Sequence, residues 1–481
     1  MMKNIILMCA GLLYSVYCFS QGATKVTIHI PQADSASLQA RIFIEDPLQP
    51  INNGFFKDTM EIRGGQCQFL FDIKNTSLMT LFINNKYITM PGLYSVLIEP
   101  NDSLVFDLPP INEAGFFGFG IAKVDVSGKG REKINLTKNI INSYVKLSKA
   151  DPEYQKQSLT YKYEAADRKL HVIDSLYRSE LHVSSHIKDL VKAQLYGNVL
   201  QMLFRSSKRS ENDSLRMLFD KYIVKKNRME VFLKKDVVQY GGILGSYLIL
   251  SEFKNPVKVN GEFFQKEHSL EYAEILVRRL NTFPEIRDYL LSAHLITTIL
   301  KGFDSTTTKL YHYYLDKADF DNPNFNNVVN TYEETERKFA VGKPFYDFHL
   351  PDSTGKIYSL KDFKGKVLLF DFWFNGCSGC KTMVPVLEQI EKELSGKNVQ
   401  FVSIGIDKRQ TWLAGIGKYS CSNSLQLYTN EQTDNHPMIK YLNIYGYPRL
   451  IIVDKKGNIS AAPFDPRISK KQFIEQIESL L

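Results

Sequence analysis

The pattern of hydrophobic and polar positions divides the chain into parts with different secondary structure. From about residue 23 to residue 108, short β-prone runs are separated by turn residues, and many runs alternate apolar with polar positions. This alternation is typical of antiparallel strands, whose side chains point in turn to the two faces of a sheet. We therefore predict an N-terminal antiparallel β domain, a small sandwich or barrel, over residues 22–110. Its strands are expected at residues 26–30, 40–44, 67–71, 81–83, 94–98 and 103–108.

Helical periodicity dominates the middle of the chain, after a connection rich in glycine and phenylalanine at residues 115–130. The clearest apolar stripe has the spacing of three and four residues that places side chains on one helix face. It consists of Ile187, Leu190, Val191, Leu195, Val199, Leu200, Leu203 and Phe204. Further helices are predicted at 215–233, at 270–280 and from Pro284, since proline is favoured at the first helical position. Residues 125–338 are therefore predicted to form a mostly α-helical domain, a spacer or interaction region.

Strands and helices alternate in the last part of the chain, residues 340–481. A hairpin is predicted at 348–360, followed by strands at 367–374, 399–406, 425–428, 449–454 and 459–462. Helices are expected from Cys377, at 411–419, at 437–442 and after Ser469, where Ser469 and Gln472 form a capping box. Such alternation predicts an α/β domain with a mixed sheet flanked by helices, so the whole chain is expected to be multidomain.

Residues 1–21 have the features of a secretory signal peptide. Lys3 precedes an apolar stretch at 5–19, which small or polar residues follow from Ser20. The stretch is shorter than the roughly 20 residues that a spanning helix needs. We predict export to the periplasm or cell envelope with cleavage near Ser20. An uncleaved anchor, which would leave the protein membrane-associated, is the alternative.

Composition and charge argue against several classes of protein and of binding site. An apolar content of 44% and an aromatic content of 12% suffice for packed cores, and the net charge of +8 comes from interspersed residues of both signs. This balance argues against a disordered chain and against nucleic-acid binding. Without the signal peptide, the remaining cysteines are Cys67, Cys377, Cys380 and Cys421, too few for a disulfide-stapled scaffold. Zinc would need a second cysteine pair or clustered histidines, so no metal and no separate cofactor is expected.

The candidate chemistry lies where the apolar strand at 367–374 meets the next helix. Asp371 interrupts this strand, and Cys377 and Cys380 follow at the helix start. Cys377 is expected to be an exposed first-turn residue, where free N–H groups and the helix dipole favour a thiolate. Cys380 lies one turn further on the same face and can attack a mixed disulfide. Asp371 could accept its proton if burial raises the pKa of Asp371, or it could be a hydrogen-bonded core carboxylate without a catalytic role.

Several residues around this pair carry a resemblance to a known family. They are Phe372-Trp373 before the Cys-x-x-Cys, Pro385 five residues after it, and Tyr447-Pro448 before the last sheet strands. Over residues 340–481 the chain resembles the thioredoxin superfamily, and within it the exported TlpA/ResA-like thiol-disulfide oxidoreductases. More loosely, the β domain looks like the N-terminal domain of certain Bacteroidetes members of this family.

The resemblance implies roles for residues that spacing alone does not assign. Pro448 would be a cis-proline facing the two cysteines, and the Tyr447 backbone would pair with substrate. Trp373, Tyr447, Pro448 and Arg449 together are the expected substrate-binding residues. Arg449 stands where threonine is common, which would place a cation beside the substrate groove.

Other positions depart from the family pattern. Gly379 replaces the common proline before Cys380, so the redox potential and the direction of electron flow stay open. Gly376 replaces the usual tryptophan, which would leave Cys377 less shielded. Met383 stands where some relatives of this type carry a catalytic glutamate.

The resulting hypothesis is an exported thiol-disulfide oxidoreductase, in the role of a reductase of protein disulfides. A membrane thiol-disulfide carrier would be its electron donor, and its cellular role would be redox homeostasis and antioxidant activity. A peroxidase is disfavoured because Phe374 occupies the position where a peroxidatic cysteine needs a threonine. The non-enzyme alternative is an envelope binding protein with a thioredoxin-like scaffold domain. Cys421 is interpreted as a structural cysteine, with a third redox partner as the alternative.

Overall fold

The structure is a computed structural model of the 481-residue chain. It describes residues 23–30, 38–45, 54–56, 59–83, 86–88, 95–109, 124–147, 157–179, 183–206, 212–234, 237, 242–253, 258–259, 262–263, 268–301, 303–444, 446–460, 463 and 465–481. Within these residues the chain forms two compact units. The first contains the N-terminal strands, helix α1 and the adjoining ends of α2 and α3, and the second contains the rest of these two helices and all that follows.

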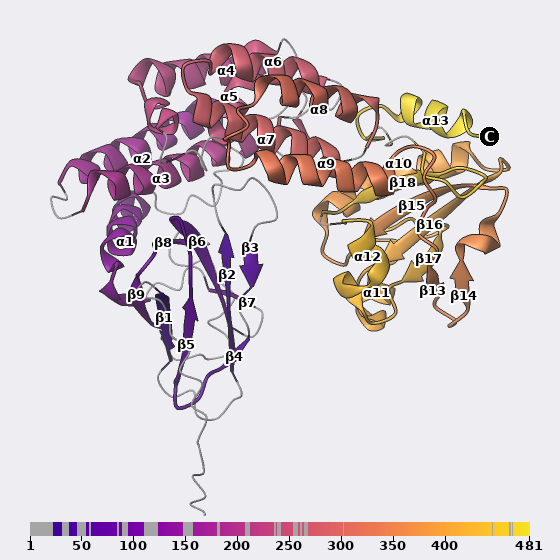
Figure 1. The fold of residues 1–481 in the computed structure, drawn as a ribbon, viewed down its shortest axis with the longest axis horizontal. Helices are drawn as coiled ribbons and strands as arrows, with labels where there is room; N and C mark the ends of the chain where they lie inside the picture. Colours follow the sequence, from indigo (N-terminus) through magenta and orange to yellow (C-terminus); the bar gives the residue numbers. More distant parts are fainter. Residues whose placement is uncertain are drawn as a thin grey trace, which may run out of the picture. The chain divides into compact units, whose positions relative to one another are not determined.

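The first unit is built from two sheets (Figure 1). One has the order β10-β9-β1-β5, and the other runs β3-β2-β6-β7, with β4 paired to β2 and β8 paired to β6. The pairs are antiparallel apart from β1 with β9, which is parallel. The strands are β1 (Thr24–His29), β2 (Gln39–Glu45), β3 (Gly54–Phe56), β4 (Met60–Glu61), β5 (Gln66–Phe71), β6 (Ser77–Ile83), β7 (Lys86–Ile88), β8 (Val96–Ile98), β9 (Ser103–Asp107) and β10 (Asp125–Lys129).

Alternation along these strands decides which residues are buried. In β1 and β6 every second residue is buried, as the period of two requires. Helix α1 (Arg131–Leu147) is attached to the sheet through a buried ion pair, in which Lys133 Nζ lies 2.7 Å from Asp102 Oδ2 and 3.2 Å from Glu99 Oε2. The Lys133 side chain is only 2% exposed, so the two carboxylates compensate a charge that water does not reach.

The helical region follows the predicted apolar stripes. Its helices are α2 (Leu159–Ser179), α3 (Ser185–Ser206), α4 (Asn212–Tyr222), α5 (Gly242–Glu252), α6 (Ser269–Arg279), α7 (Pro284–Lys301), α8 (Ser305–Lys317) and α9 (Phe325–Phe339), with a short hairpin of β11 (Lys258–Val259) and β12 (Glu262–Phe263). The predicted stripe from Ile187 to Phe204 is the buried face of α3. The segment predicted as one helix at 215–233 is instead α4 followed by 3-10 turns, with Asn227 in the left-handed conformation between them.

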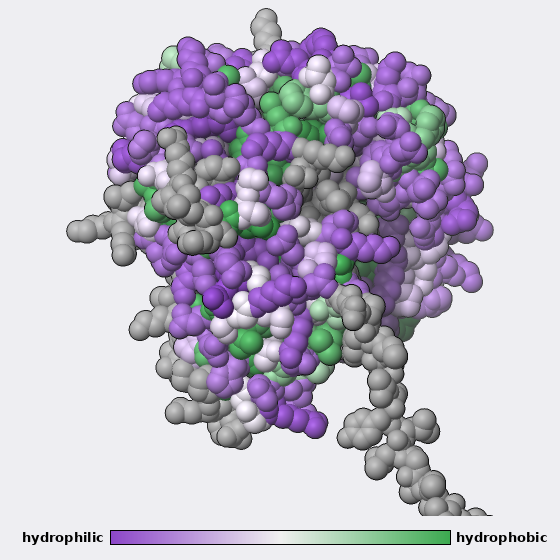
Figure 2. All heavy atoms as spheres, turned by 60° about the vertical axis from the view of Figure 1, so that its left-hand side comes forward, coloured by the Kyte–Doolittle hydropathy of each residue, from purple (hydrophilic) through white to green (hydrophobic). Residues whose placement is uncertain are grey.

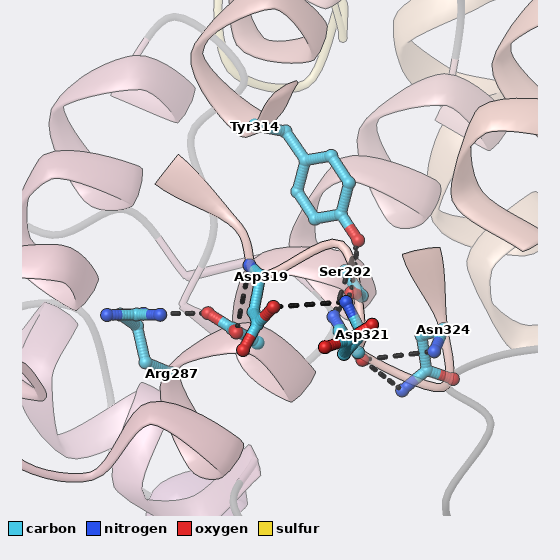
Figure 3. A network of polar contacts seen from close by, with 8 residues as sticks. Arg287, Ser292, Tyr314, Asp319, Asp321 and Asn324 are labelled. Carbon is cyan, nitrogen blue, oxygen red and sulfur yellow. Dashed lines mark hydrogen bonds and ion pairs between the residues drawn. The ribbon is translucent and has the colours of Figure 1, made fainter. Parts of the chain in front are cut away.

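A polar network holds the loop between α8 and α9 to the buried side of α7 (Figure 3). Asp288 accepts from the Arg287 side chain at 2.7 Å and from the Asp319 backbone at 3.2 Å. Tyr314 and Ser292 share a 3.0 Å hydrogen bond, and the Asn322 side chain reaches both hydroxyls. Tyr314 of α8 is therefore both a buried core residue and a member of this network.

The C-terminal α/β domain is a mixed sheet with the order β17-β16-β15-β18. β15 and β16 are parallel, as are β16 and β17, whereas β18 is antiparallel to β15. Its elements are β13 (His349–Pro351), β14 (Ile357–Ser359), β15 (Val367–Trp373), α10 (Ser378–Glu393), β16 (Val399–Gly405), α11 (Arg409–Gly415), β17 (Leu425–Tyr428), α12 (Pro437–Tyr441), β18 (Arg449–Val453) and α13 (Lys470–Glu478).

Two apolar layers cover this sheet. On one face Leu369 and Ile452 pack against Leu387 of α10 and Phe473 of α13. On the other face the core contains Phe370 and residues of α12 together with the segment at 345–350. The predicted fold class is thus confirmed: an N-terminal, mainly antiparallel β region, a helical middle and a C-terminal α/β domain.

Some predicted boundaries differ from the structure. β10 pairs with β9, so residues 125–129 extend the N-terminal sheet, whereas the prediction ended the β domain at 110 and opened the helical domain at 125. α11 ends at Gly415 and does not reach residue 419. The strand predicted at 459–462 is an isolated bridge between Val453 and Ile459 within the described residues.

The predicted signal peptide at residues 1–21 lies outside the described residues. Among the helices that the structure does describe, none is long and apolar enough to cross a membrane. On the face drawn in Figure 2, hydrophilic residues predominate and hydrophobic residues appear as small separate areas. Large apolar side chains with high exposure come from different elements, for example Met217 in α4 and Ile357 in β14.

Close packing in the α/β domain leads to a test of its core. A Cβ atom at Gly415, the last residue of α11, would lie 2.6 Å from Cζ3 of the fully buried Trp373. We expect Gly415→Ala to lower the free energy of unfolding by about 1–3 kcal/mol, because the ring has no room to move. Urea unfolding of the full chain measures this change. The matched control is Gly446→Ala, where nothing lies within 4 Å of the added atom; equal stability of the two variants would contradict this packing.

Candidate active site

The site is built on the end of the central strand β15. Neighbours pair with this strand on both edges and both faces are covered, so every residue from Val367 to Trp373 is buried. This explains the unbroken apolar run, since a strand covered on both sides has no solvent face. Asp371 is the residue that departs from it.

A short turn leads from β15 to the cysteines. Gly376 has φ of +103°, a region that other residues rarely adopt. Two hydrogen bonds hold this turn. The Asn375 backbone N–H donates to Asp407 Oδ2 at 2.6 Å, and the Asn375 side chain donates to the Thr411 carbonyl. Cys377 follows as the N-cap of α10, so the helix begins at Ser378, one residue later than predicted.

Cys377 and Cys380 form a disulfide, with their Cα atoms 5.2 Å apart. The Cys380 backbone N–H donates to Cys377 Sγ at 3.0 Å. In the reduced protein the same donor, with the positive end of the helix dipole, favours a thiolate at Cys377. The predicted Cys-x-x-Cys pair is thus brought together at a helix N-terminus.

The predicted exposure of Cys377 was wrong. Cys377 is 4% exposed and Cys380 is 1% exposed. Both belong to a cluster with Trp373, against which Phe374 and Tyr447 pack. The rings of Phe374 and Tyr447 meet edge to face at 5.5 Å, so aromatic neighbours shield Cys377 although Gly376 provides no side chain.

Asp371 lies inside the core, and none of the described residues forms an ion pair with it. It is 5% exposed, and no described residue hydrogen-bonds its Oδ1 atom. Burial raises the pKa of its carboxyl from 3.8 to about 7, because the charged form loses its hydration. Strand alternation puts Asp371 on the same face as Leu369, the face that α10 covers.

The Tyr447–Pro448 peptide bond is cis, as the resemblance implied. The Tyr447 hydroxyl is buried and lacks a hydrogen-bond partner among the described residues. Burial, with smaller contributions from Asp434 and Asp407, raises the pKa of Tyr447. Tyr447, the residue before the cis-proline, also packs against the cluster that contains the disulfide.

Two other predicted substrate-binding residues do not face a substrate in this structure. Trp373 is fully buried under Gly415, so its side chain presents no surface to a substrate in this structure. Arg449 pairs with Phe372 in β15 and lies on the same sheet face as Ile451, and its guanidinium donates to the carbonyl of Leu300 in α7. The cation expected beside the substrate groove thus points into the contact with the helical region.

Cys421 is separate from the dithiol. It is a free, 1% exposed thiol in the core beneath α10, with its Sγ 3.8 Å from the Val384 carbonyl. Burial first, and then the nearby Asp371 carboxylate, raise the pKa of the Cys421 thiol. A thiol held in its protonated form is a poor nucleophile, which fits the structural interpretation. Cys67, the other free cysteine in the described part, is buried in β5.

Asp407 and Asn375 belong to the site, yet the sequence reasoning did not single them out. Asp407 follows β16, the parallel neighbour of β15, so both strands end at the same edge of the sheet. This placement could have pointed to Asp407. In the described part of the chain there is no cluster of three or more His, Cys, Asp or Glu residues that could hold a metal ion. The chemistry available here is that of the two thiols and the buried carboxyl.

Comparisons with known proteins agree with this geometry. The Thioredoxin-like family profile matches residues 365–459. A thioredoxin-like protein of Bacillus subtilis, YneN, is 29% identical over 137 residues, which are 28% of this chain and 76% of that protein. The thiol-disulfide oxidoreductase ResA of Bacillus cereus is 25% identical over 151 residues, 31% of this chain and 82% of ResA.

Solved structures are similar over the same share of the chain. The thioredoxin domain of a thiol-disulfide oxidoreductase from Bacteroides vulgatus is 27% identical, with a TM-score of 0.27, and the match covers 29% of this chain and 97% of that domain. The family match and the ResA relatives coincide with the Cys-x-x-Cys pair on its strand–turn–helix unit. The C-terminal domain is therefore a thioredoxin-like domain of the disulfide-oxidoreductase type, similar to ResA.

Proposed function

We propose that the protein is an exported reductase of protein disulfides, with Cys377 as nucleophile, Cys380 as resolving thiol and Asp371 as proton acceptor. The observation that carries this proposal is the Cys377–Cys380 pair at the start of α10, with the Cys380 N–H directed at Cys377 Sγ. This arrangement stabilises a thiolate on Cys377 rather than on Cys380.

The first step is an attack by the Cys377 thiolate on one sulfur of a substrate disulfide. A new S–S bond forms between Cys377 and the substrate, and the substrate's second sulfur leaves as a thiolate that takes up a proton. Tyr447, the residue before cis-Pro448, packs against the cluster that contains Cys377, and in this proposal its backbone pairs with a substrate segment. Because Cys377 is 4% exposed, Phe374 and Tyr447 must give way for this contact.

The second step needs a thiolate at Cys380. Two observations support Asp371 as the acceptor: it lies on the sheet face that α10 covers, and its pKa of about 7 suits proton transfer near neutral pH. Cys380 then attacks Cys377 Sγ, the mixed disulfide breaks, and the substrate leaves with its second thiol. The substrate gains two electrons, and the protein gains the Cys377–Cys380 disulfide present in the structure.

The oxidised protein then has to be reduced again. We assign this step to a membrane thiol-disulfide carrier, which would attack the same disulfide and receive it. Export is supported by the signal-like residues 1–21, which place the reaction in the periplasm or envelope. In this scheme, no metal or organic cofactor takes part.

Replacing the cysteines separates the two steps. Cys377→Ser is expected to reduce insulin disulfides only at background rate, because no thiolate remains to attack. Cys380→Ser is expected to accumulate mixed disulfides with protein substrates, since the resolving thiol is absent. Insulin turbidity and non-reducing gels measure these outcomes.

The matched control is Cys421→Ala, which removes the buried thiol outside the pair and should leave the rate close to that of the wild type. Full insulin reduction by Cys377→Ser would contradict the proposal. A wild-type protein without reductase activity that still binds envelope proteins would instead favour the scaffold alternative.

The raised pKa of Asp371 predicts the pH dependence of stability. The folded protein keeps the Asp371 proton up to about pH 7, whereas the unfolded chain releases it near pH 4. The free energy of unfolding should therefore fall between pH 4 and 7. Asp371→Asn should remove this slope and be more stable than the wild type at pH 8, by on the order of 4 kcal/mol. Urea unfolding at several pH values measures it.

The same titration predicts the pH dependence of the rate. Resolution requires ionised Asp371, so single-turnover reduction by the wild type should rise with pH through about 7. Asp371→Asn should lose this rise and be slower by about 100-fold. The control is Asp347→Asn, an exposed aspartate of the same domain. An unchanged pH profile in Asp371→Asn would leave Asp371 as a core carboxyl without a catalytic role.

A further inference from the structure

Arg449 occupies an unusual position for a cation. It is the first residue of β18 and directly follows the cis-proline Pro448. Its backbone pairs with Phe372 on the central strand, two residues before the turn that leads to the cysteines. The Arg449 side chain leaves the sheet on the face opposite α10, toward the helical region.

The Arg449 side chain is partly buried there, and its polar contact is with a backbone carbonyl instead of a carboxylate. Arg449 Nη1 donates to the Leu300 carbonyl at 2.6 Å, and no ion pair of Arg449 occurs among the described residues. Burial lowers the pKa of Arg449 to about 10, so the side chain still carries its charge at neutral pH. A buried charge is costly unless its environment compensates it.

The end of α7 supplies this compensation. Leu300 is the penultimate residue of α7, which ends at Lys301. The last four carbonyls of a helix lack partners within the helix, and its C-terminal end carries a partial negative charge. A guanidinium at this end both satisfies a free carbonyl and interacts favourably with the dipole. The bond thus links the last turn of one helix to the strand after the cis-proline.

Apolar contacts between the same two regions surround this bond. Arg449 shares a small cavity with Phe303, which follows α7, and with Phe339 at the end of α9. Phe339 also meets Tyr441 of α12 edge to face at 5.8 Å. The α/β domain and the helical region belong to one compact unit, so this contact is part of a continuous structure.

We propose that Arg449 is a positioning residue, through which the C-terminal end of α7 holds the cis-Pro448 segment in its substrate-binding geometry. The covalent path is short, because Arg449 adjoins Pro448, and Tyr447 packs on the cluster of Cys377 and Cys380. The helical region is then a part of the substrate-binding apparatus. This inference rests on the proposed reaction at Cys377.

The test uses the full-length protein and two substitutions. Arg449→Met removes the charge and the donors but keeps the apolar stem, whereas Arg449→Lys keeps the charge and a donor. We expect Arg449→Met to lower kcat/KM for insulin reduction by about ten- to hundredfold, mainly through KM, because the substrate-pairing backbone is displaced. Arg449→Lys should recover most of this loss. The Cys377–Cys380 reduction potential should stay unchanged, since the dithiol itself is not altered.

Hydrogen exchange provides a readout that does not depend on activity. In Arg449→Met, amides at 446–453 and those at the end of α7 should exchange faster than in the wild type, and Arg449→Lys should restore their protection. The matched control is Arg63→Met, which removes an exposed arginine from its pair with Glu61 in the other unit and should change neither readout.

Two results would overturn the proposal. One is an Arg449→Met variant that loses thermal stability while its kcat/KM and its exchange at 446–453 match the wild type. The other is equal impairment of Arg449→Met and Arg449→Lys, which would mean that the charge is not what holds the segment. A wild type without reductase activity would refute the proposed function, while the exchange comparison would still decide whether Arg449 couples the two regions.

Discussion

An uncompensated carboxyl group in the middle of a fully buried strand is the constraint on which the active site depends. Ionising Asp371 inside the core costs about 4 kcal/mol more than ionising it in water, so the group keeps its proton until about pH 7. A leucine in its place would suit the surrounding apolar core better. The protein thus carries a local destabilisation at neutral pH, and the proposed proton transfer explains why such a residue is useful there.

Aromatic neighbours cover the two cysteines of the disulfide. In the disulfide form, Cys377 is nearly as buried as Cys380, with Phe374 and Tyr447 packed against the cluster that holds both. The adjoining turn is held by hydrogen bonds from Asn375 to Asp407 and to the Thr411 carbonyl. A buried Tyr447 hydroxyl without a partner is itself costly, and a substrate group that supplies one would favour the open arrangement.

Arg449 links the helical region to the strand that follows the cis-proline near the two cysteines. The partly buried Arg449 guanidinium donates to the Leu300 carbonyl at the C-terminal end of α7, where the helix dipole favours a positive charge. In the α/β domain, the residue that makes this contact is the one directly after the cis-proline.

Local pattern was enough to determine much of this protein. The two-residue and 3.6-residue periods identified strands such as β1 and β15 and helices such as α3 and α7, because each depends mainly on which residues must be buried. The spacing of Cys377 and Cys380 at a helix start specified the reaction class. Tertiary structure decided the rest. The exposure of Cys377 depends on rings contributed by Tyr447, and the partner of Arg449 lies 149 residues earlier, at Leu300. The same holds for β10, whose place in the first sheet is set by pairing with β9 rather than by its own glycine-containing sequence. Contacts between segments distant in the chain leave no local period, so only the folded structure reveals them.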